Sequence, residues 1–128
     1  MLYLDSSALA KLVVAEPESA ALRRYLKRRP DRSTSELSVA EVLRAALRRD
    51  DELVDAARQI LARVDRITLG RQLIETAGTL IPRGMRTLDA LHLASALELG
   101  DELEAVVAYD VRLLDAAAAH GLRTTSPD

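Results

Sequence analysis

Residues 1–11 read MLYLDSSALAK, and this stretch decides the class of fold. Its apolar beginning, Leu2–Leu4, predicts a short buried strand. The polar residues that follow end the strand, and Ser6 or Ser7 is expected to cap a helix over residues 8–15. A buried strand that passes through a polar turn into a helix predicts a fold in which strands and helices alternate.

The same alternation continues to the end of the chain. Apolar residues at helical spacing predict further helices over residues 16–29, 36–49, 51–64, 71–80, 87–99 and 111–120. Short runs typical of strands occur at residues 32–35, 66–69, 104–109 and 122–125. Short strands separated by helices predict an α/β fold with a mainly parallel central sheet.

The composition sets limits on the class of protein. The chain has 128 residues, of which 48% are apolar, so one domain with one ordinary core is expected over residues 1–128. It contains no cysteine, which excludes disulfides, thiolate metal sites and thiol nucleophiles and fits a reducing compartment. No apolar run approaches the roughly 20 residues of a membrane span. We therefore expect a cytoplasmic protein with no membrane partner.

The net charge of −2 does not by itself indicate a polyanionic partner. Basic residues nevertheless gather in one segment, at Arg23, Arg24, Lys27, Arg28, Arg29 and Arg32. Such a run fits a solvated helix face, and a surface that faces phosphates is the alternative. The chain has no Phe or Trp and only three Tyr, which weakens any case for base stacking.

Two aspartates, Asp5 and Asp110, directly follow expected strands. Ligands of open parallel sheets bind beyond the carboxyl ends of the strands, so both residues stand where a site would form. An aspartate after a strand also commonly caps the next helix. Taken singly, each residue is explained equally well by either role.

Two further acids lie on helices. Asp89 begins a helix that is apolar on almost all sides, where a carboxylate is unusual. The alternative explanation is that Thr87 is the N-cap and Asp89 interacts with the positive end of the helix dipole in the first turn. His92 shares its face and could complete a zinc or iron site, although a hydrogen-bonded packing histidine is the favoured interpretation. Glu41 lies on the polar side of its helix, where an ion pair with Arg44 would explain it.

Four carboxylates brought together would repel one another by about 4 kcal/mol per pair at about 4 Å and an effective dielectric of about 20. Such a cluster takes up protons or binds a cation, and oxygen ligands without cysteine favour Mg²⁺ or Mn²⁺. A hard cation can lower the pKa of a bound water and neutralise charge on a phosphodiester. No G-x-S-x-G elbow, Walker loop or H-E-x-x-H pair offers another reaction centre.

Four segments of the sequence resemble, in order, the successive motifs of PIN domains. They are residues 1–11 around Asp5, 35–42 around Glu41, 88–96 around Asp89 and 108–117 around Asp110. Together with the ending GLRTTSP at residues 121–127, their order is most similar to that of the VapC toxins of bacterial toxin–antitoxin pairs. The resemblance covers essentially the whole chain.

This resemblance implies a PIN-like three-layer α/β/α fold. It places Asp5, Glu41, Asp89 and Asp110 at the positions of the family's metal-binding catalytic acids. It also implies Mg²⁺ as cofactor, with Mn²⁺ as an alternative, and endoribonuclease activity on RNA. As partners it implies a second copy of the chain in a homodimer and a cognate VapB-type antitoxin whose tail enters the acidic cleft.

Three lesser residues are also predicted to belong to the site. Ser6, beside the first acid, and Asp115, after the fourth, are candidates for side chains that hold the acids in place. Arg112 is a candidate for positioning the RNA backbone, on the basis of its charge. One departure from the family pattern is Tyr109, because a small hydroxyl residue is common before the fourth acid.

Two other functions are alternatives to a nuclease. The first is a phosphatase or receiver domain in which Asp5 accepts a phosphoryl group. Haloacid-dehalogenase-like enzymes carry a second Asp two residues after the acceptor, but this chain has Ser7 there. A receiver domain carries adjacent acids ahead of the acceptor, but only four residues precede Asp5. Both differences argue against this function. The second is a non-cleaving PIN-like dimer that binds RNA or a partner, although such a module has little use for clustered repulsive charge.

Overall fold

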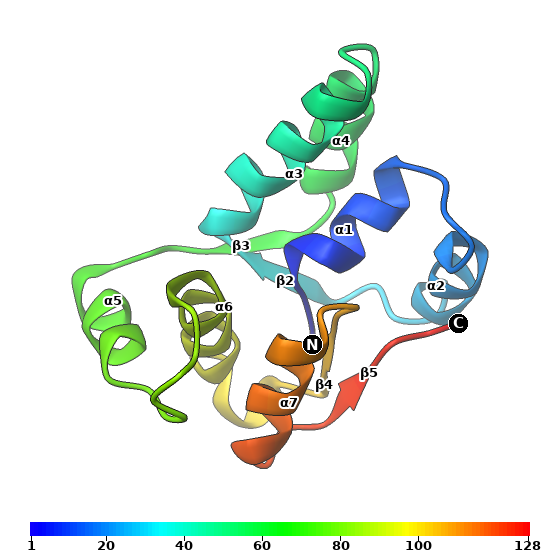
Figure 1. The fold of residues 1–128 in the computed structure, drawn as a ribbon. Coiled ribbons are helices and arrows are strands. Elements are labelled where there is room, and N and C mark those ends of the chain that lie inside the picture. The colour runs from blue at the N-terminus through cyan, green and yellow to red at the C-terminus, as the bar shows by residue number, and fades with distance from the viewer.

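The computed structural model describes all 128 residues, and a five-stranded parallel sheet forms its centre (Figure 1). The strands are β1 (Leu2–Leu4), β2 (Arg32–Ser35), β3 (Asp65–Ile67), β4 (Ala105–Val107) and β5 (Thr124–Thr125), arranged in the order β3-β2-β1-β4-β5. The central strand β1 pairs on both sides, with Leu2 opposite Arg32 of β2 and Ala105 of β4. The predicted α/β class is confirmed, and the sheet is parallel throughout.

Helices form every connection between the strands. They are α1 (Ser6–Val13) and α2 (Ser19–Leu26) before β2, α3 (Glu36–Arg49) and α4 (Leu53–Leu61) before β3, α5 (Arg71–Gly78) and α6 (Thr87–Leu97) before β4, and α7 (Val111–Ala119) before β5. A short 3₁₀ turn, η1 (Gly100–Glu102), follows α6. None of these helices combines the length and apolarity that a membrane crossing requires.

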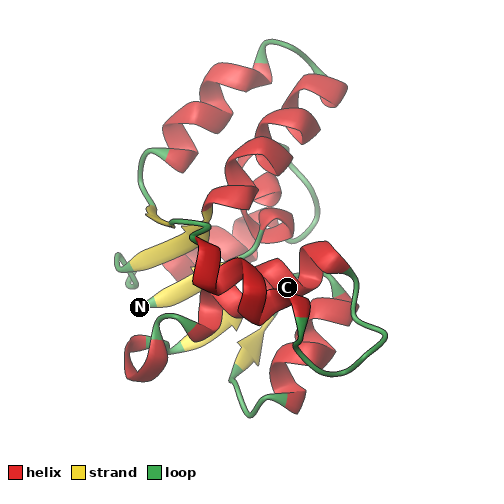
Figure 2. Ribbon diagram, turned by 90° about the vertical axis from the view of Figure 1, so that its left-hand side faces the viewer, coloured by secondary structure: helices red, strands yellow, loops and turns green.

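The side chains of β1 alternate between two hydrophobic cores, as the two-residue period of a strand requires. Leu2 and Leu4 pack with the buried residues of α1 to α4 on one face of the sheet. Tyr3 points to the opposite face and packs against α6 and α7. Helix α5 packs on α6 through a smaller cluster that includes Leu73 and Ala90. The sheet thus lies between two groups of helices, which is the predicted three-layer arrangement (Figure 2).

The chain reverses its direction across the sheet once. From β1 it steps to β2 and β3 at one edge, then returns to β4 on the other side of β1 and continues to β5. Because crossovers between parallel strands are right-handed, this reversal puts the later helices on the opposite face. It also leaves the carboxyl ends of β1 and β4 side by side, and such a point is where open α/β sheets bind ligands.

Strand β2 is polar and yet buried. The Ser33 hydroxyl donates to the Leu2 carbonyl at 3.1 Å, and the Thr34 hydroxyl donates to the Leu4 carbonyl at 2.7 Å. The Thr34 oxygen also lies 2.6 Å from Oγ of Ser38 in α3. No buried side-chain nitrogen or oxygen in the structure lacks a hydrogen-bond partner, which explains how a strand of hydroxyl residues fits into the core.

The predicted helix starts are the least accurate part of the sequence interpretation. Neither Ser6 nor Ser7 is the N-cap of α1, because Asp5 is extended and its carboxylate accepts from the Ala8 amide. The N-cap of α6 is Arg86 rather than Thr87. Helix α2 begins only at Ser19, after a turn at residues 17–18. For α1 and α6 the local cap rule chose a close neighbour of the residue that caps the helix start.

Replacing Thr34 with Val should test the contribution of the polar strand. Valine keeps the branched shape but leaves the Leu4 carbonyl without this donor, so we expect a loss of about 1 to 3 kcal/mol in the free energy of unfolding. Urea denaturation measures it. Thr124→Val, at an exposed position of β5, is the control and should change stability by less than about 0.5 kcal/mol. Equal effects of the two substitutions would contradict this role of Thr34.

Candidate active site

The four acids predicted from the sequence meet in one place. Asp5 follows β1, Glu41 lies in α3, Asp89 lies in the first turn of α6, and Asp110 precedes α7. All four line a cavity of about 260 Å³ at the carboxyl ends of β1 and β4. The cavity is completed by Ser6, Ser7, Arg86, Thr87, Leu88 and His92.

Asp5 is held firmly at the end of β1. Its side chain is 3% exposed, and its Oδ1 accepts hydrogen bonds from Ser7 Oγ at 2.6 Å and from the Ala8 amide at 2.9 Å. The Ser7 oxygen in turn accepts from the Tyr109 amide at 2.9 Å. Ser7 therefore connects the first acid to the segment that carries the fourth. The sequence interpretation named Ser6 instead, and only the pairing of β1 with β4 brings Ser7 and Tyr109 together.

Asp110 and Asp5 each combine the two roles that the sequence left open. Asp110 caps α7, with its Oδ1 accepting from the Arg112 amide at 3.0 Å, as Asp5 caps α1. Each residue nevertheless lines the cavity. The positive end of a helix dipole favours a carboxylate, so capping stabilises the charge of both acids at the site.

Glu41 does not form the ion pair with Arg44 that was the alternative explanation of its position. Its Oε1 lies 2.7 Å from Nε2 of His92, a residue of α6 that is 3% exposed. The Nδ1 atom of the same ring lies 2.6 Å from the Tyr3 hydroxyl. The packing of α3 and α6 around β1 thus overrides the local helix spacing. It confirms His92 as a hydrogen-bonded packing residue, with both ring nitrogens engaged by protein groups.

Asp89 has the least support of the four acids. Its side chain is 7% exposed, and its carboxylate accepts no hydrogen bond. Burial, and after it the nearby charge of Asp110, raises the pKa of Asp89 above its ordinary value. Burial likewise raises the pKa of Asp5, although the bonds from Ser7 and Ala8 oppose the shift. No Lys or Arg forms an ion pair with any of the four acids.

The donor set fits a hard divalent cation. Asp5, Glu41 and Asp110 each engage one carboxylate oxygen in a hydrogen bond and leave the other without one. Oxygens of this kind are the ligands that Mg²⁺ and Mn²⁺ prefer. No three acids or histidines lie close enough together to bind a metal ion as they stand. Binding an ion would therefore require these side chains to draw together.

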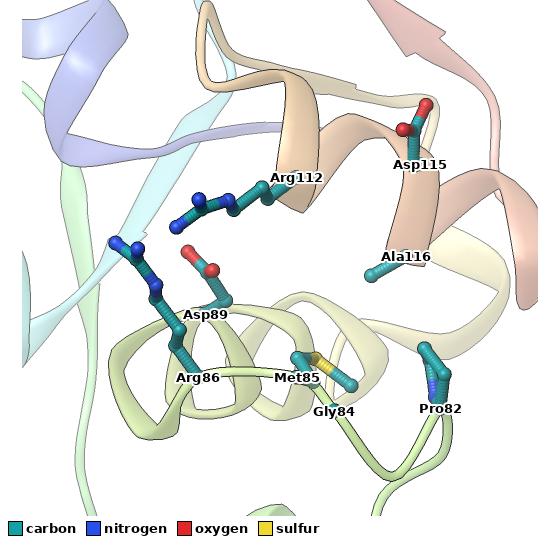
Figure 3. Close-up of a pocket in the computed structure, with 8 residues that line it drawn as sticks. All are labelled: Pro82, Gly84, Met85, Arg86, Asp89, Arg112, Asp115 and Ala116. Atoms are coloured by element: carbon teal, nitrogen blue, oxygen red, sulfur yellow. The ribbon is translucent and has the colours of Figure 1, made fainter.

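A second cavity of about 530 Å³ adjoins the acids and shares Arg86 and Asp89 with the first (Figure 3). Arg86 and Arg112 extend from neighbouring helices toward the Asp89 carboxylate, whereas Asp115 points away from it (Figure 3). Asp115 lines this second cavity, is exposed, and does not line the cavity of the four acids. The two arginines are placed to meet an anion that approaches Asp89.

Two other features lie away from the acids. Arg23, Arg24 and Lys27 of the basic segment line a separate cavity that shares no residue with that of the acids. The side chain of Tyr109 turns toward the C-terminal tail, because its hydroxyl donates to the Pro127 carbonyl at 2.6 Å. Only its backbone amide takes part in the site, through Ser7.

The chain matches known proteins over nearly its whole length. The PIN domain model matches residues 2–119. Ribonuclease VapC46 of Mycobacterium tuberculosis is 46% identical over 126 residues, which is 98% of this chain and 97% of that protein. Ribonuclease VapC47 of the same species is 39% identical over 132 residues, 99% of this chain and 97% of that protein. Both similarities extend over all four acid-bearing segments.

Solved structures show the same fold at lower sequence identity. The crystal structure of Mycobacterium tuberculosis VapC20, described as a Sarcin-Ricin loop cleaving toxin, superposes with a TM-score of 0.79 at 20% identity and covers 99% of this chain and 100% of that one. A toxin–antitoxin complex from Klebsiella pneumoniae gives a TM-score of 0.76 at 19% identity, covering 100% of this chain and 98% of that one. The PIN-like form of the α/β fold is thereby confirmed.

The raised pKa of Asp89 predicts how stability depends on pH. In the unfolded chain this acid releases its proton near its ordinary pKa of 3.8, whereas in the folded protein it keeps the proton to higher pH. Stability therefore falls as the pH rises from about 3.8 through the higher folded pKa. Asp89→Asn removes this loss, so the variant should be more stable than the parent protein at neutral pH, by an amount that shrinks to zero below about pH 3.8.

Urea unfolding of both proteins in chelator, from acid to neutral pH, measures this difference. Added Mg²⁺ should narrow it at neutral pH, because a cation that binds only the folded state stabilises the parent protein. A stability difference that does not change with pH would contradict the assignment.

Proposed function

We propose that the cavity of four acids is the active site of a Mg²⁺-dependent endoribonuclease, with Mn²⁺ as the alternative metal. The premise is that this chain belongs to the PIN-domain family and is one of its VapC ribonucleases. One observation carries the proposal. Asp5, Glu41, Asp89 and Asp110 come from four separate segments and line a single cavity at the point where the sheet reverses direction.

The four acids are proposed to hold the cation between them. Mg²⁺, when bound, supplies a water of lowered pKa and a positive charge that stabilises the growing negative charge on the phosphate. Asp5 and Asp110 are suited to fixed ligand positions because each is anchored at a helix N-terminus. The hydrogen bond from His92 gives Glu41 a third anchored position.

Asp89 is proposed to orient the attacking water and accept its proton. No hydrogen bond holds its carboxylate, and its raised pKa brings it closer to the range in which a general base works at neutral pH. Attack in line at phosphorus then leaves a 5′-phosphate on the product.

Arg86 and Arg112 are proposed to bind the RNA backbone beside the scissile phosphate. The two guanidinium groups flank Asp89 at the junction of the two cavities (Figure 3). Phosphate contacts of this kind position a nucleic acid without reading its sequence. The Arg112 assignment made from charge alone is thus supported by its place beside Asp89, and Arg86 joins it.

The chain is proposed to act as the toxin of a toxin–antitoxin pair, restrained by a VapB-type antitoxin. None of the four acids is ion-paired with a Lys or Arg of this chain, and such a cluster suits a cationic side chain from a partner. One solved structure of the same fold is a toxin–antitoxin complex. A homodimer is proposed on family membership. The one-domain organisation and the cytoplasmic location stay predictions from the sequence.

Replacing Asp5 with Asn should abolish RNA cleavage with little loss of stability. Asparagine is nearly isosteric and still caps a helix, but it lacks the charge that binds a cation. We expect at least about a 100-fold fall in cleavage rate, and excess chelator should produce the same loss in the parent protein. Cleavage of single-stranded RNA is the measurement. Asp55→Asn, an exposed acid of α4, is the control and should cleave normally.

Full activity of Asp5→Asn, or of the parent protein in chelator, would contradict the metal-dependent mechanism. Metal-independent RNA binding with no cleavage of any RNA by the parent protein would instead favour the non-cleaving PIN-like dimer.

Replacing Arg112 with Ala should weaken RNA binding rather than remove the chemistry. In the Asp5→Asn background, which leaves RNA intact, the slope of log K against log salt should decrease in magnitude by about 0.7 to 1, the value of one lost phosphate contact. Fluorescence anisotropy with a labelled single-stranded RNA measures this slope. Arg49→Ala, at the other end of α3 from the site, is the matched control, and equal slopes for the two variants would contradict the assignment.

A further inference from the structure

We infer that Tyr3 and His92 are positioning residues, which fix the Glu41 carboxylate in the active site through a directed chain of two hydrogen bonds. The kinetic part of this inference rests on the proposed nuclease function, whereas the hydrogen-bond arrangement does not. Neither residue is among those predicted for the site from the sequence.

The two hydrogen bonds lead from the hydrophobic core to the cavity. Tyr3 is fully buried in β1, and its hydroxyl lies 2.6 Å from Nδ1 of His92 in α6. Nε2 of His92 lies 2.7 Å from Oε1 of Glu41, whose side chain is 26% exposed. Three elements that the sheet brings together thus contribute one polar group each, and the last two, His92 and Glu41, line the cavity.

The buried phenol sets the direction of the two bonds. A tyrosine hydroxyl carries its proton at neutral pH and is the natural donor to a ring nitrogen 2.6 Å away. The neutral imidazole has one acceptor and one donor nitrogen. With Tyr3 donating to Nδ1, the ring proton lies on Nε2 and is donated to Glu41. In the opposite tautomer, the lone pair of His92 Nε2 would face a lone pair of Glu41 Oε1, and no hydrogen bond would form between them.

Glu41 has particular need of such an anchor. Asp5 and Asp110 are held by the backbone amides of the helices that they cap, but Glu41 lies inside α3 and has no amide to accept from. A glutamate side chain has the rotamer freedom to leave the cavity, and ordering it costs conformational entropy. The bond from His92 holds Oε1 and leaves Oε2 available for the cation.

The arrangement also offers a clean substitution. The rings of Tyr3 and His92 pack edge to face, with centroids 6.0 Å apart and planes at 72°. Phenylalanine at position 3 keeps this packing and removes only the hydroxyl. At position 92, glutamine can still donate an amide proton toward Glu41, whereas alanine cannot.

Nitrogen-15 NMR of the imidazole tests the direction of the bonds without metal or RNA. In the parent protein His92 should carry its proton on Nε2 and none on Nδ1. Tyr3→Phe should weaken this preference and produce a mixture of tautomers. A protonated Nδ1 in the parent protein, or an unchanged tautomer in the variant, would overturn the inference whether or not the protein cleaves RNA.

Kinetics test the positioning role. His92→Ala should lower kcat by about 10- to 100-fold, the usual effect of losing a group that orients a metal ligand, with KM for RNA nearly unchanged. His92→Gln should recover most of the lost kcat, and the kcat of Tyr3→Phe should lie between those of the parent protein and His92→Ala. Tyr25→Phe, which removes a tyrosine hydroxyl away from the site, is the control and should leave kcat unchanged.

A purely structural role would give a different pattern. It would lower the fraction of folded protein, which urea unfolding reports, and would leave the kcat of the folded fraction unaltered. Equal kcat for parent and His92→Ala proteins would overturn the positioning role. A parent protein that cleaves no RNA would refute the proposed function, and the NMR measurement would still decide the arrangement of the bonds.

Discussion

β1 and β4 are neighbours in the parallel sheet, with Leu2 opposite Ala105, although they stand near opposite ends of the chain. The reversal of strand order between them sets the position of everything else. It separates the helices onto two faces of the sheet and places the N-termini of α1 and α7 at one point. Asp5 and Asp110 cap those helices, so the dipoles that favour a carboxylate at each helix start also make a cluster of like charges tolerable. The Ser7 hydroxyl, bonded to both sides of the junction, ties the two ends together.

The acids differ in what holds them, and this difference assigns their roles. Helix amides hold Asp5 and Asp110, a histidine backed by a buried tyrosine holds Glu41, and no hydrogen bond holds Asp89. Anchored carboxylates suit a cation because each has little rotamer freedom left to lose when the ion binds, although the set must still draw together around it. A free carboxylate of raised pKa suits proton transfer. The burial that disfavours the charged forms is a cost in stability, which perturbed acids at functional sites commonly impose.

Local rules succeeded where neighbours along the chain decide the outcome. The helix over residues 36–49 has the predicted ends, and the polar strand at residues 32–35 forms as expected. They failed where a distant group competes. Helix spacing allowed Glu41 to pair with Arg44 one turn away, but it pairs with His92, which is 51 positions away, since that histidine is buried and needs an acceptor. The cap of α1 was placed on a serine because the rule does not tell which of several adjacent polar residues is the last extended one.

The sequence by itself determined the alternation of strands and helices, the aliphatic character of the core, and the four acids in their family order, whereas the structure divides the expected single core between the two faces of the sheet. Apolar periodicity and the motifs around each acid are properties of short segments, and no folding is needed to read them. Only the tertiary structure decided that these acids share one cavity, that Ser7 links Asp5 to Tyr109, and that His92 joins Tyr3 to Glu41. The Glu41–His92, Tyr3–His92 and Ser7–Tyr109 contacts join residues 51, 89 and 102 positions apart. Strand pairing and the packing of helices on the sheet, rather than any local preference, bring such residues within hydrogen-bond distance.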